Sequence, residues 1–379
     1  MKFLSAKHVD FALYVHVPFC VAKCGYCSFY SLPFAESAAE VWLLAVTREA
    51  KRLAEIWGAP PPLRTIYIGG GTPSVLPLVL WKRLLHVLED VFDLSSLREA
   101  TVEANPCSLK NEHLRLWRDS FLTRISLGVQ SLHNNELLRL GRLHDAPMAL
   151  QALEESLSFG FDVSADLIFG LPLQTLRTWN DSLRRVVAAG ALHVSVYQLT
   201  LEPGTPMGDD APPLPDGYSF YRLTQWYLAR KGLPQYEISS FSRLGKECLH
   251  NLAYWRQENV LALGPAAWGY LDGFRYRNAS TLESYAAATE TGLAVDWAEF
   301  LEGRSRGIEA AIIALRTKWG IDVNSFSKRF GSDLTGEVLN VLSGIPKRLT
   351  HLNPGCFALT PSGMRVGNAI WTELLELDS

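Results

Sequence analysis

Short apolar runs alternate with longer amphipathic stretches from residue 11 to about residue 200. The apolar runs predict six strands, at Ala12–Val17, Thr65–Ile68, Ala100–Glu103, Arg124–Gly128, Asp162–Ile168 and His193–Leu199. The amphipathic stretches predict helices at Ala38–Trp57, Pro77–Phe92, Asn111–Asp119, Pro147–Phe159 and Thr175–Ala189. Strands and helices that alternate at this spacing form a parallel sheet through right-handed crossovers. We therefore predict an α/β fold built on an open or partial (β/α)6 barrel, whose ligands bind at the carboxyl ends of the strands.

The rest of the chain follows a different pattern. The stretch 202–217 holds five prolines and is followed by a predicted helix at Tyr218–Lys231 and by a region with many aromatic residues. From about Leu301 the pattern is mainly helical and ends in a short strand-like run and a last helix. We predict a barrel over residues 1–205, a barrel-completing region over 206–300, and a smaller, mainly helical, winged-helix-like C-terminal domain over 301–379.

Three of the six cysteines lie within eight residues, at Cys20, Cys24 and Cys27, directly after the first predicted strand. Thiolates gathered this closely usually hold a metal ion or an iron–sulfur cluster. A tetrahedral zinc site usually takes four protein ligands, whereas three cysteines leave one iron of a [4Fe–4S] cluster open to a small molecule. The spacing C-x3-C-x2-C therefore favours an open [4Fe–4S] cluster. The alternatives are a zinc site completed by His16 or a distant residue, and a disulfide with one spare thiol. The other three cysteines are interpreted as structural.

Charge and hydropathy limit the partners and the compartment. The net charge of −3 argues against general nucleic-acid binding. Residues 1–10 lack the long apolar run of a secretory signal, and no apolar stretch approaches the ~20 residues of a membrane span. We predict a cytoplasmic protein with reduced thiols and no membrane span.

A second motif, Gly69-Gly-Gly-Thr-Pro, follows the strand predicted at Thr65–Ile68. Three glycines permit unusual backbone angles and the close approach of a ligand to the main chain, so this motif predicts a binding turn beside the cysteines. Polar residues also mark later strand ends or the segments after them, at Glu103, Gln130, Arg142 and Asp166. The two acids stand in otherwise apolar strands, and burial of a carboxylate is costly unless it is paired or hydrogen-bonded. An amine or a ribose diol of a ligand would supply that compensation.

The cysteine spacing, with Tyr26 just before the last cysteine, resembles the radical S-adenosylmethionine (radical SAM) superfamily. In that superfamily the amino and carboxylate groups of the methionine part chelate the open iron. One-electron reduction then cleaves the sulfonium to a 5′-deoxyadenosyl radical. The glycine turn is similar to the superfamily's segment that binds the methionine amine.

Longer segments resemble the oxygen-independent coproporphyrinogen oxidase group. They run in the group's order from residue 14 to residue 172, and the similarity extends past residue 200 to nearly the full length. They include Tyr-Val-His-Val-Pro-Phe-Cys, Ile-Gly-Gly-Gly-Thr-Pro-Ser, Val-Glu-Ala-Asn-Pro, Ile-Ser-Leu-Gly-Val-Gln-Ser, Leu-Gly-Arg-Leu-His and Asp-Leu-Ile-Phe-Gly-Leu-Pro. The resemblance implies that S-adenosylmethionine is bound by Tyr14, Tyr26, Gly70, Gly71, Thr72, Glu103, Gln130, Arg142 and Asp166.

Two branches of this group differ in sequence features that can be checked in this chain. The oxidases carry a fourth cysteine two residues after the third, and an N-terminal extension that contributes to the substrate site. This chain has Phe29 at that position and only 19 residues before Cys20. Both features, and the run His250-Asn-Leu-Ala-Tyr-Trp, resemble the HemW-like haem chaperones, which are thought to pass haem to respiratory haem proteins.

The resemblance to this branch implies haem as cargo. Imidazole is a common haem ligand, which makes His250 a candidate axial ligand; the alternative is a structural histidine near the turn at Asn251. The family often has a Gly-Cys-Gly-Ala-His-like run after the signature, where this chain has Gly264-Pro-Ala-Ala-Trp-Gly. Neither Pro265 nor Trp268 ligates iron, so the prediction of haem ligation rests on His250.

We therefore predict a haem chaperone that binds a [4Fe–4S] cluster and S-adenosylmethionine. It would deliver haem to haem-accepting respiratory proteins, with peripheral contact to membrane enzymes. The alternative is an oxygen-independent coproporphyrinogen III oxidase, or another radical SAM enzyme that acts on a tetrapyrrole. We assign no catalytic residue and expect no coproporphyrinogen oxidase activity.

Overall fold

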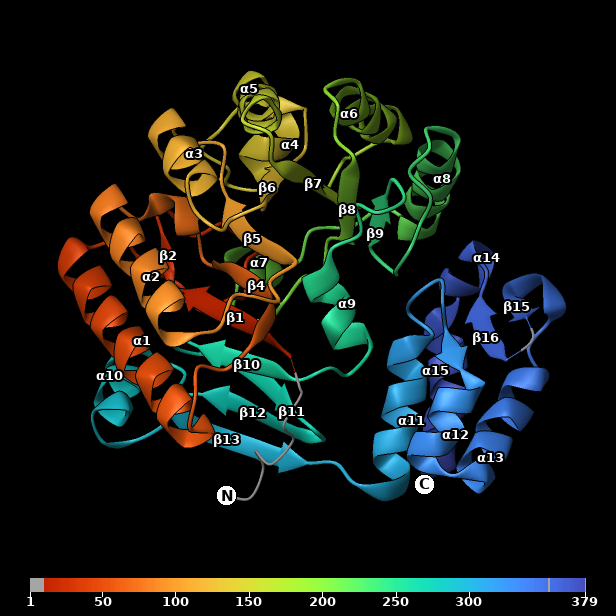
Figure 1. The fold of residues 1–379 in the computed structure, drawn as a ribbon. Coiled ribbons are helices and arrows are strands. Elements are labelled where there is room, and N and C mark those ends of the chain that lie inside the picture. Colours follow the sequence, from red (N-terminus) through yellow and green to blue (C-terminus); the bar gives the residue numbers. More distant parts are fainter. Residues whose placement is uncertain (1–9, 354, 379) are drawn as a thin grey trace.

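The computed structural model of the chain describes residues 10–353 and 355–378. Its centre is a curved parallel sheet, with helices around its outer side (Figure 1). The six predicted strands all form and lie side by side in chain order as β1 (Phe11–Val17), β4 (Leu63–Gly70), β5 (Glu99–Ala104), β6 (Arg124–Gln130), β7 (Asp162–Phe169) and β8 (His193–Gln198). The predicted α/β class is therefore confirmed.

The predicted helices connect these strands. They are α1 (Glu36–Trp57), α2 (Leu78–Val91), α3 (Asn111–Arg118), α5 (Ala146–Ser158) and α6 (Leu176–Ala188), with a short α4 (Asn134–Arg139) between β6 and α5. The apolar faces of the main helices pack on the outer surface of the sheet, and residues such as Trp42, Leu84 and Trp117 are fully buried there. The apolar residues whose spacing predicts each helix thus form the helix face that packs on the sheet.

Alternation within the strands separates two surfaces of the sheet. Outward side chains such as those of Ile66, Val102 and Leu127 lie in the main hydrophobic core. The alternate positions face the barrel interior and are largely polar: Thr65, Tyr67, Thr101, Glu103, Ser126, Ser164, Asp166, His193 and Ser195. Buried polar groups need hydrogen-bond partners, and neighbouring strands supply them across this interior. Ser164 Oγ, for example, lies 2.8 Å from His193 Nδ1.

Five further strands extend the sheet at both edges, where the sequence predicted none. At one edge β9 (Ser240–Ser242) pairs antiparallel with β8. At the other, β10 (Val260–Leu263) pairs parallel with β1, and antiparallel strands follow as β11 (Trp268–Leu271), β12 (Phe274–Asn278) and β13 (Val295–Phe300). These strands are short, and β10 pairs with a strand far earlier in the chain. Local periodicity carries no signal for such pairing.

The connecting helices α7 (Pro206–Asp210), α8 (Gly217–Arg230), α9 (Leu249–Trp255) and α10 (Leu282–Thr291) complete this region. Helix α9 closes the barrel at the end where the parallel strands begin. Glu99, the first residue of β5, accepts hydrogen bonds from the backbone N–H groups of Leu249 and His250, both at 2.9 Å. A carboxylate at a helix N-terminus satisfies otherwise unpaired N–H donors and complements the helix dipole, so this contact anchors α9 under the barrel.

The C-terminal part forms a second unit with its own hydrophobic core, seen beside the barrel in Figure 1. It consists of helices α11 (Gly303–Ala314), α12 (Val323–Phe330), α13 (Ser332–Ser343), α14 (Pro361–Met364) and α15 (Gly367–Leu375), with a small sheet of β14 (Ile321–Asp322), β16 (Cys356–Leu359) and β15 (Thr350–Asn353). The helical prediction for this region is confirmed in type. The exact boundaries of the three domains, and the winged-helix description, stay predictions.

Polar contacts join this unit to the barrel. Lys318 Nζ lies 3.1 Å from the Glu247 carboxylate, and the Arg316 guanidinium lies over the rings of Trp255 and Trp371 at 5.5 and 4.3 Å from their centroids. None of the helices within residues 10–353 and 355–378 combines the length and apolar character that spanning a bilayer requires.

Candidate cofactor site

The three clustered cysteines lie on a loop that leaves the carboxyl end of β1. The loop is held at its ends by the two-residue strands β2 (Phe19–Cys20) and β3 (Leu32–Pro33), which pair in parallel. Two side chains from other parts of the barrel donate to the sulfurs: Thr72 Oγ1 lies 3.4 Å from Cys20 Sγ, and Arg142 Nη1 lies 3.4 Å from Cys24 Sγ. Such donors stabilise thiolates, which are the form that ligates iron.

The zinc alternative requires His16 or a distant residue as the fourth ligand. His16, proposed there as the fourth ligand, is buried with both ring nitrogens engaged. Its Nδ1 lies 3.1 Å from Tyr14 Oη, and its Nε2 lies 3.0 Å from the Tyr30 carbonyl oxygen. Burial lowers the pKa of His16 to about 4, so the ring stays neutral. In the part of the chain that the structure describes, no three His, Cys, Asp or Glu side chains, the loop cysteines included, are gathered closely enough to hold a metal ion, so the ligand role of these cysteines stays a prediction.

The glycine turn lies directly against the cysteine loop, at the end of β4. The Gly71 N–H donates to the Val17 carbonyl at 2.8 Å, and the Thr72 N–H donates to the Phe19 carbonyl at 2.7 Å. Gly70 has φ +110°, and a Cβ there would lie 2.4 Å from the His16 ring. A side chain is therefore excluded by both backbone angle and space, which explains why this turn is glycine-rich.

Two carboxyl groups face this turn from inside the barrel. Glu103 accepts hydrogen bonds from the Gly70 N–H and from Tyr67 Oη, both at 2.9 Å. Asp166 accepts from Ser126 Oγ at 2.6 Å and from Ser164 Oγ at 2.9 Å. Burial raises the pKa of Glu103 to about 7 and also raises that of Asp166. Both side chains are half-buried, and a bound cation would offset the cost of ionising them.

A pocket of about 460 Å³ opens between the cysteine loop and these acids. It is lined by all three cluster cysteines and by eight of the ten residues predicted to bind cofactors: Tyr26, Gly70, Gly71, Thr72, Glu103, Gln130, Arg142 and Asp166. Tyr14 lies one layer deeper, stacked on Tyr67 with ring centroids 6.2 Å apart. The rule that ligands meet the carboxyl ends of parallel strands therefore brings these residues together here, while their individual roles stay predictions.

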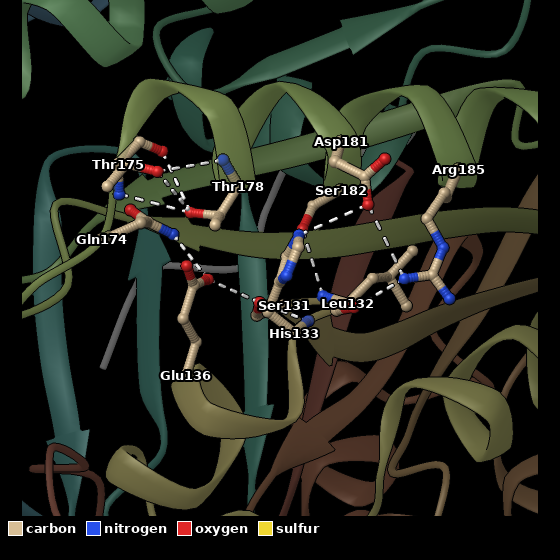
Figure 2. A network of polar contacts seen from close by, with 10 residues as sticks. All are labelled: Ser131, Leu132, His133, Glu136, Gln174, Thr175, Thr178, Asp181, Ser182 and Arg185. Carbon is tan, nitrogen blue, oxygen red and sulfur yellow. Dashed lines mark hydrogen bonds and ion pairs between the residues drawn. The ribbon is translucent and has the colours of Figure 1, made fainter.

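Polar contacts join the segments that follow β6 and β7. Figure 2 shows this network, in which the buried Glu136 carboxylate accepts from Ser131 Oγ at 2.7 Å and from Gln174 Nε2 at 3.0 Å. Gln130 adopts φ 64°, a left-handed conformation, at the end of β6. Arg142 donates from Nη2 to the Gly128 carbonyl at 2.8 Å. Its Nε is buried with no hydrogen-bond partner among the described residues.

His250 lies elsewhere. It is on α9, at the opposite end of the barrel from the cysteine loop, and only 1% of its surface is exposed. Its Nδ1 lies 3.0 Å from Thr65 Oγ1, and its ring packs on Tyr67 with centroids 5.2 Å apart. Its Nε2 is buried with no hydrogen-bond partner among the described residues, and burial lowers the pKa of His250 to about 3. The structure therefore does not bring His250 to a surface that a haem can reach, and its ligand role stays a prediction.

Sequence reasoning missed several residues of the site. Tyr67, Ser126 and Tyr197 also line the pocket. Tyr67 and Ser126 occupy alternate positions in apolar strands, so a search for polar residues at period two would have found them. Cys107, interpreted as a scattered structural cysteine, lines a small hollow together with Cys24 and Arg142. Cys107 follows the end of a predicted strand, and this position could have marked it as a residue near the site.

Comparisons with known proteins agree with this geometry. A family model described as the radical SAM superfamily matches residues 14–186. Coproporphyrinogen III oxidase (HemN) from Escherichia coli, described as a radical SAM enzyme, has a structure that matches with a TM-score of 0.84. The match covers 97% of this chain and 90% of that chain at 21% sequence identity, and shows a shared fold. Fold, site and family model thus define a radical SAM protein, and the predicted partial barrel of that type is confirmed.

Sequence relatives narrow this class. The heme chaperone HemW of Bacillus subtilis is 31% identical over 373 residues, which cover 96% of this chain and 98% of the relative. HemW of Lactococcus lactis is 33% identical over 373 residues, with 96% of each chain covered. HemW of Mycobacterium tuberculosis is 37% identical over 287 residues, with 73% of each covered. The chain belongs to the HemW family of heme chaperones.

Proposed function

We propose that this protein is a haem chaperone that carries a [4Fe–4S] cluster and S-adenosylmethionine and delivers haem to respiratory haem proteins. The observation that carries the proposal is the nearly full-length similarity to relatives named heme chaperone HemW. The site supports the cluster and S-adenosylmethionine parts of the proposal, because three thiols, a glycine turn and two half-buried acids line one pocket.

In this proposal Cys20, Cys24 and Cys27 hold the cluster, which when bound supplies an open iron and a source of single electrons. The Gly70–Thr72 turn would pass its backbone beside the methionine end of S-adenosylmethionine. Glu103 and Asp166 would compensate the positive charge or hydroxyl donors of that ligand, at the carboxyl ends of β5 and β7. Arg142 would donate a hydrogen bond to the Cys24 sulfur.

The chaperone role is favoured over coproporphyrinogen oxidation by one position on the cysteine loop. Phe29 stands where the oxidases carry a further cysteine; the residue is 65% exposed and lines the pocket. A phenyl ring neither ligates iron nor transfers a proton. The oxidase, or another radical reaction on a tetrapyrrole, is the competing function. A cytoplasmic location, haem-accepting proteins and contact with membrane enzymes remain parts of the proposal.

Anaerobic reconstitution followed by two parallel assays tests this function. Haem titration by visible absorption should reach saturation near one haem per chain. Incubation with coproporphyrinogen III, S-adenosylmethionine and a low-potential reductant should leave the substrate unchanged by chromatography. Decarboxylated product would replace the chaperone proposal by the oxidase, and absence of haem binding would remove it.

A further inference from the structure

A chain of hydrogen-bonded side chains runs from the cofactor pocket through the barrel interior to the end where α9 lies. It begins at Asp166, which lines the pocket and accepts from Ser164 Oγ at 2.9 Å. Ser164 Oγ lies 2.8 Å from His193 Nδ1, and His193 Nε2 lies 2.8 Å from Tyr236 Oη. The chain ends where the backbone N–H of Cys248 donates to Tyr236 Oη at 3.1 Å. Ser164, His193 and Tyr236 are each at most 2% exposed, so the chain is shielded from bulk water.

The proton positions along this chain follow from its far end. A backbone N–H can only donate, so Tyr236 Oη accepts from Cys248 and gives its own proton to its other partner, His193 Nε2. Burial, and after it the positive charge of Arg124, lowers the pKa of His193 well below its usual value. The ring is therefore neutral and has one proton, and because Nε2 accepts, that proton is on Nδ1. His193 is thus a donor to Ser164.

This tautomer decides where the Ser164 proton points. The Ser164 oxygen accepts from His193 Nδ1, so its single proton is donated to Asp166 Oδ1. The longer contact with Ser195 Oγ, at 3.2 Å, is then donated by Ser195. With the other tautomer, Ser164 would donate to the ring nitrogen and Asp166 would lose this bond. Each donor in the chain is also polarised by the donor behind it, which strengthens the bond to the carboxylate.

Several groups act on the ionisation of Asp166. Burial raises its pKa, while the charge of Arg124 and hydrogen bonds from three serines oppose that rise; the serines are Ser126, Ser164 and Ser195. The other titratable or charged groups near it belong to neighbouring strands or to the lining of the same pocket: Tyr67, Glu103, Tyr197, Arg142, Cys20, Cys24 and Cys27. The ionised form therefore depends on the donors that stay committed to it.

We propose that His193 is a positioning residue for S-adenosylmethionine, which through Ser164 holds the Asp166 carboxylate ionised and ready to accept. This inference rests on the proposed function, in which Asp166 contacts that ligand. An ionised carboxylate forms strong hydrogen bonds with ammonium or hydroxyl donors. Ser126 Oγ, the donor to Oδ2, has no second hydrogen-bond partner among the described residues, so its hydroxyl can rotate, whereas His193 fixes the Ser164 proton. Tyr236 acts one step further back, by fixing the tautomer.

Variants of the reconstituted full chain test this role. His193→Leu removes the Nδ1–H donor, and His193→Asn has a similar volume but keeps an N–H donor near the same position. Tyr236→Phe leaves the tautomer unfixed without changing β8. Ser242→Ala is the matched control, because Ser242 pairs with His193 across β8 and β9, is buried, and has an Oγ with no hydrogen-bond partner among the described residues. Calorimetry would give the S-adenosylmethionine affinity between about pH 5 and about pH 8, where carboxyl groups with raised pKa values titrate.

In His193→Leu we expect an affinity about three- to tenfold below wild type at the acidic end, the effect of one hydrogen bond, and an affinity near wild type at the alkaline end. The sign follows because loss of a donor raises the pKa of Asp166 further, so the carboxyl is protonated at a higher pH. Glu103 titrates in every variant, so the ratio to wild type isolates Asp166. Tyr236→Phe should show a smaller change in the same direction, and His193→Asn should recover most of the loss. Ser242→Ala should match wild type.

Three outcomes would overturn the role of His193 alone: a loss that does not depend on pH, equal losses in His193→Leu and His193→Asn, or wild-type profiles in both His193→Leu and Tyr236→Phe. Iron content reports whether each variant folds, and if the His193 variants do not take up iron, Tyr236→Phe decides. Unchanged affinity in Asp166→Asn would remove the contact assumed in the proposed function and this inference with it. Absence of S-adenosylmethionine binding by the wild-type protein would reject that part of the proposed function itself.

Discussion

Two acids decide the electrostatics of the barrel at the scale of single residues. Glu103 and Asp166 each accept two hydrogen bonds, yet burial keeps the pKa of both above its usual value. Hydrogen bonds to neutral donors recover only part of the free energy that a carboxylate loses on leaving water. A cationic ligand supplies the remainder, which makes ligand binding and deprotonation of these acids a coupled process.

The affinity for S-adenosylmethionine should therefore depend on pH. A cation requires ionised Glu103, whose pKa is raised to about 7 in the free protein, so the affinity should fall as pH drops below about 7 and level off above it. Well below that pKa the ionised fraction falls about tenfold per pH unit. Calorimetry on the reconstituted protein would measure this slope. Glu103→Gln should bind more weakly and lose this part of the pH dependence, whereas the exposed Glu112→Gln should behave as wild type. Equal slopes in wild type and Glu103→Gln would remove Glu103 from the contact; Asp166→Asn tests the second acid in the same way.

The cluster assignment makes a second prediction at this scale. Replacing Cys20, Cys24 and Cys27 together by Ala should reduce the iron content after anaerobic reconstitution from about four per chain, as one [4Fe–4S] cluster requires, to near zero. Iron analysis and electron paramagnetic resonance of the reduced protein would check it. Cys356→Ala is the matched control, because that thiol lies on β16 of the C-terminal sheet, where its Sγ contacts the Trp319 carbonyl at 2.6 Å. A cluster of the same type in the triple variant would contradict the assignment.

At the scale of elements, the glycine turn at the end of β4 is hydrogen-bonded to the start of the cysteine loop, which follows β1. Two backbone hydrogen bonds tie the turn to residues on both sides of Pro18, and the position of the cysteines follows from them. In the same turn, the Gly70 N–H donates a hydrogen bond to the Glu103 carboxylate. A substitution in this turn should therefore disturb both the cysteine loop and Glu103. Its effect on the free energy of unfolding can be measured separately from its effect on ligand affinity.

Gly70→Ala should destabilise the fold by about 1–3 kcal/mol, the range for a strained backbone position, because φ is +110° and the new Cβ would lie 2.4 Å from the His16 ring. Urea unfolding of the cluster-free protein would give the change in free energy. Gly336→Ala is the opposite case: Gly336 lies within α13, and a Cβ there meets no atom within 4 Å. That variant should be more stable by up to about 1 kcal/mol, since alanine favours helix over glycine. Equal stability of Gly70→Ala and wild type would mean that the turn can relax without cost.

At the scale of the whole molecule, the two largest hydrophobic clusters among the described residues belong to different parts of the chain. The larger lies between the sheet and the barrel helices, and the smaller lies among α11, α12, α13 and α15. The residues that line the cofactor pocket all come from the barrel and its loops. The C-terminal unit meets the barrel through ion pairs and aromatic contacts, such as Lys318 with Glu247 and Arg316 with Trp255. Packing defects in the smaller core should therefore stay local.

Leu342→Ala, which removes a fully buried side chain of the smaller core, should cost about 2–5 kcal/mol in the unfolding of that unit. Iron content and S-adenosylmethionine affinity should remain those of wild type. Leu375→Ala, at a 55% exposed position of α15, should change stability by less than about 0.5 kcal/mol. Urea unfolding followed by tryptophan fluorescence and by hydrogen exchange would separate the two units. Loss of the cluster in Leu342→Ala would show that the cores unfold as one.

The sequence by itself determined the elements whose signals are local. Periodicity located the six parallel strands and their helices within a few residues, and the spacing of Cys20, Cys24 and Cys27 and the glycine run marked two of the strand ends that meet at the pocket. Only the tertiary structure decided contacts between segments far apart in the chain. It paired β10 with β1 and buried His250 under the barrel against Thr65. It also enclosed an apolar cavity between α1 and β13. Strand pairing and burial depend on which surfaces meet in the folded chain. Local sequence periodicity does not specify which distant segments come into contact.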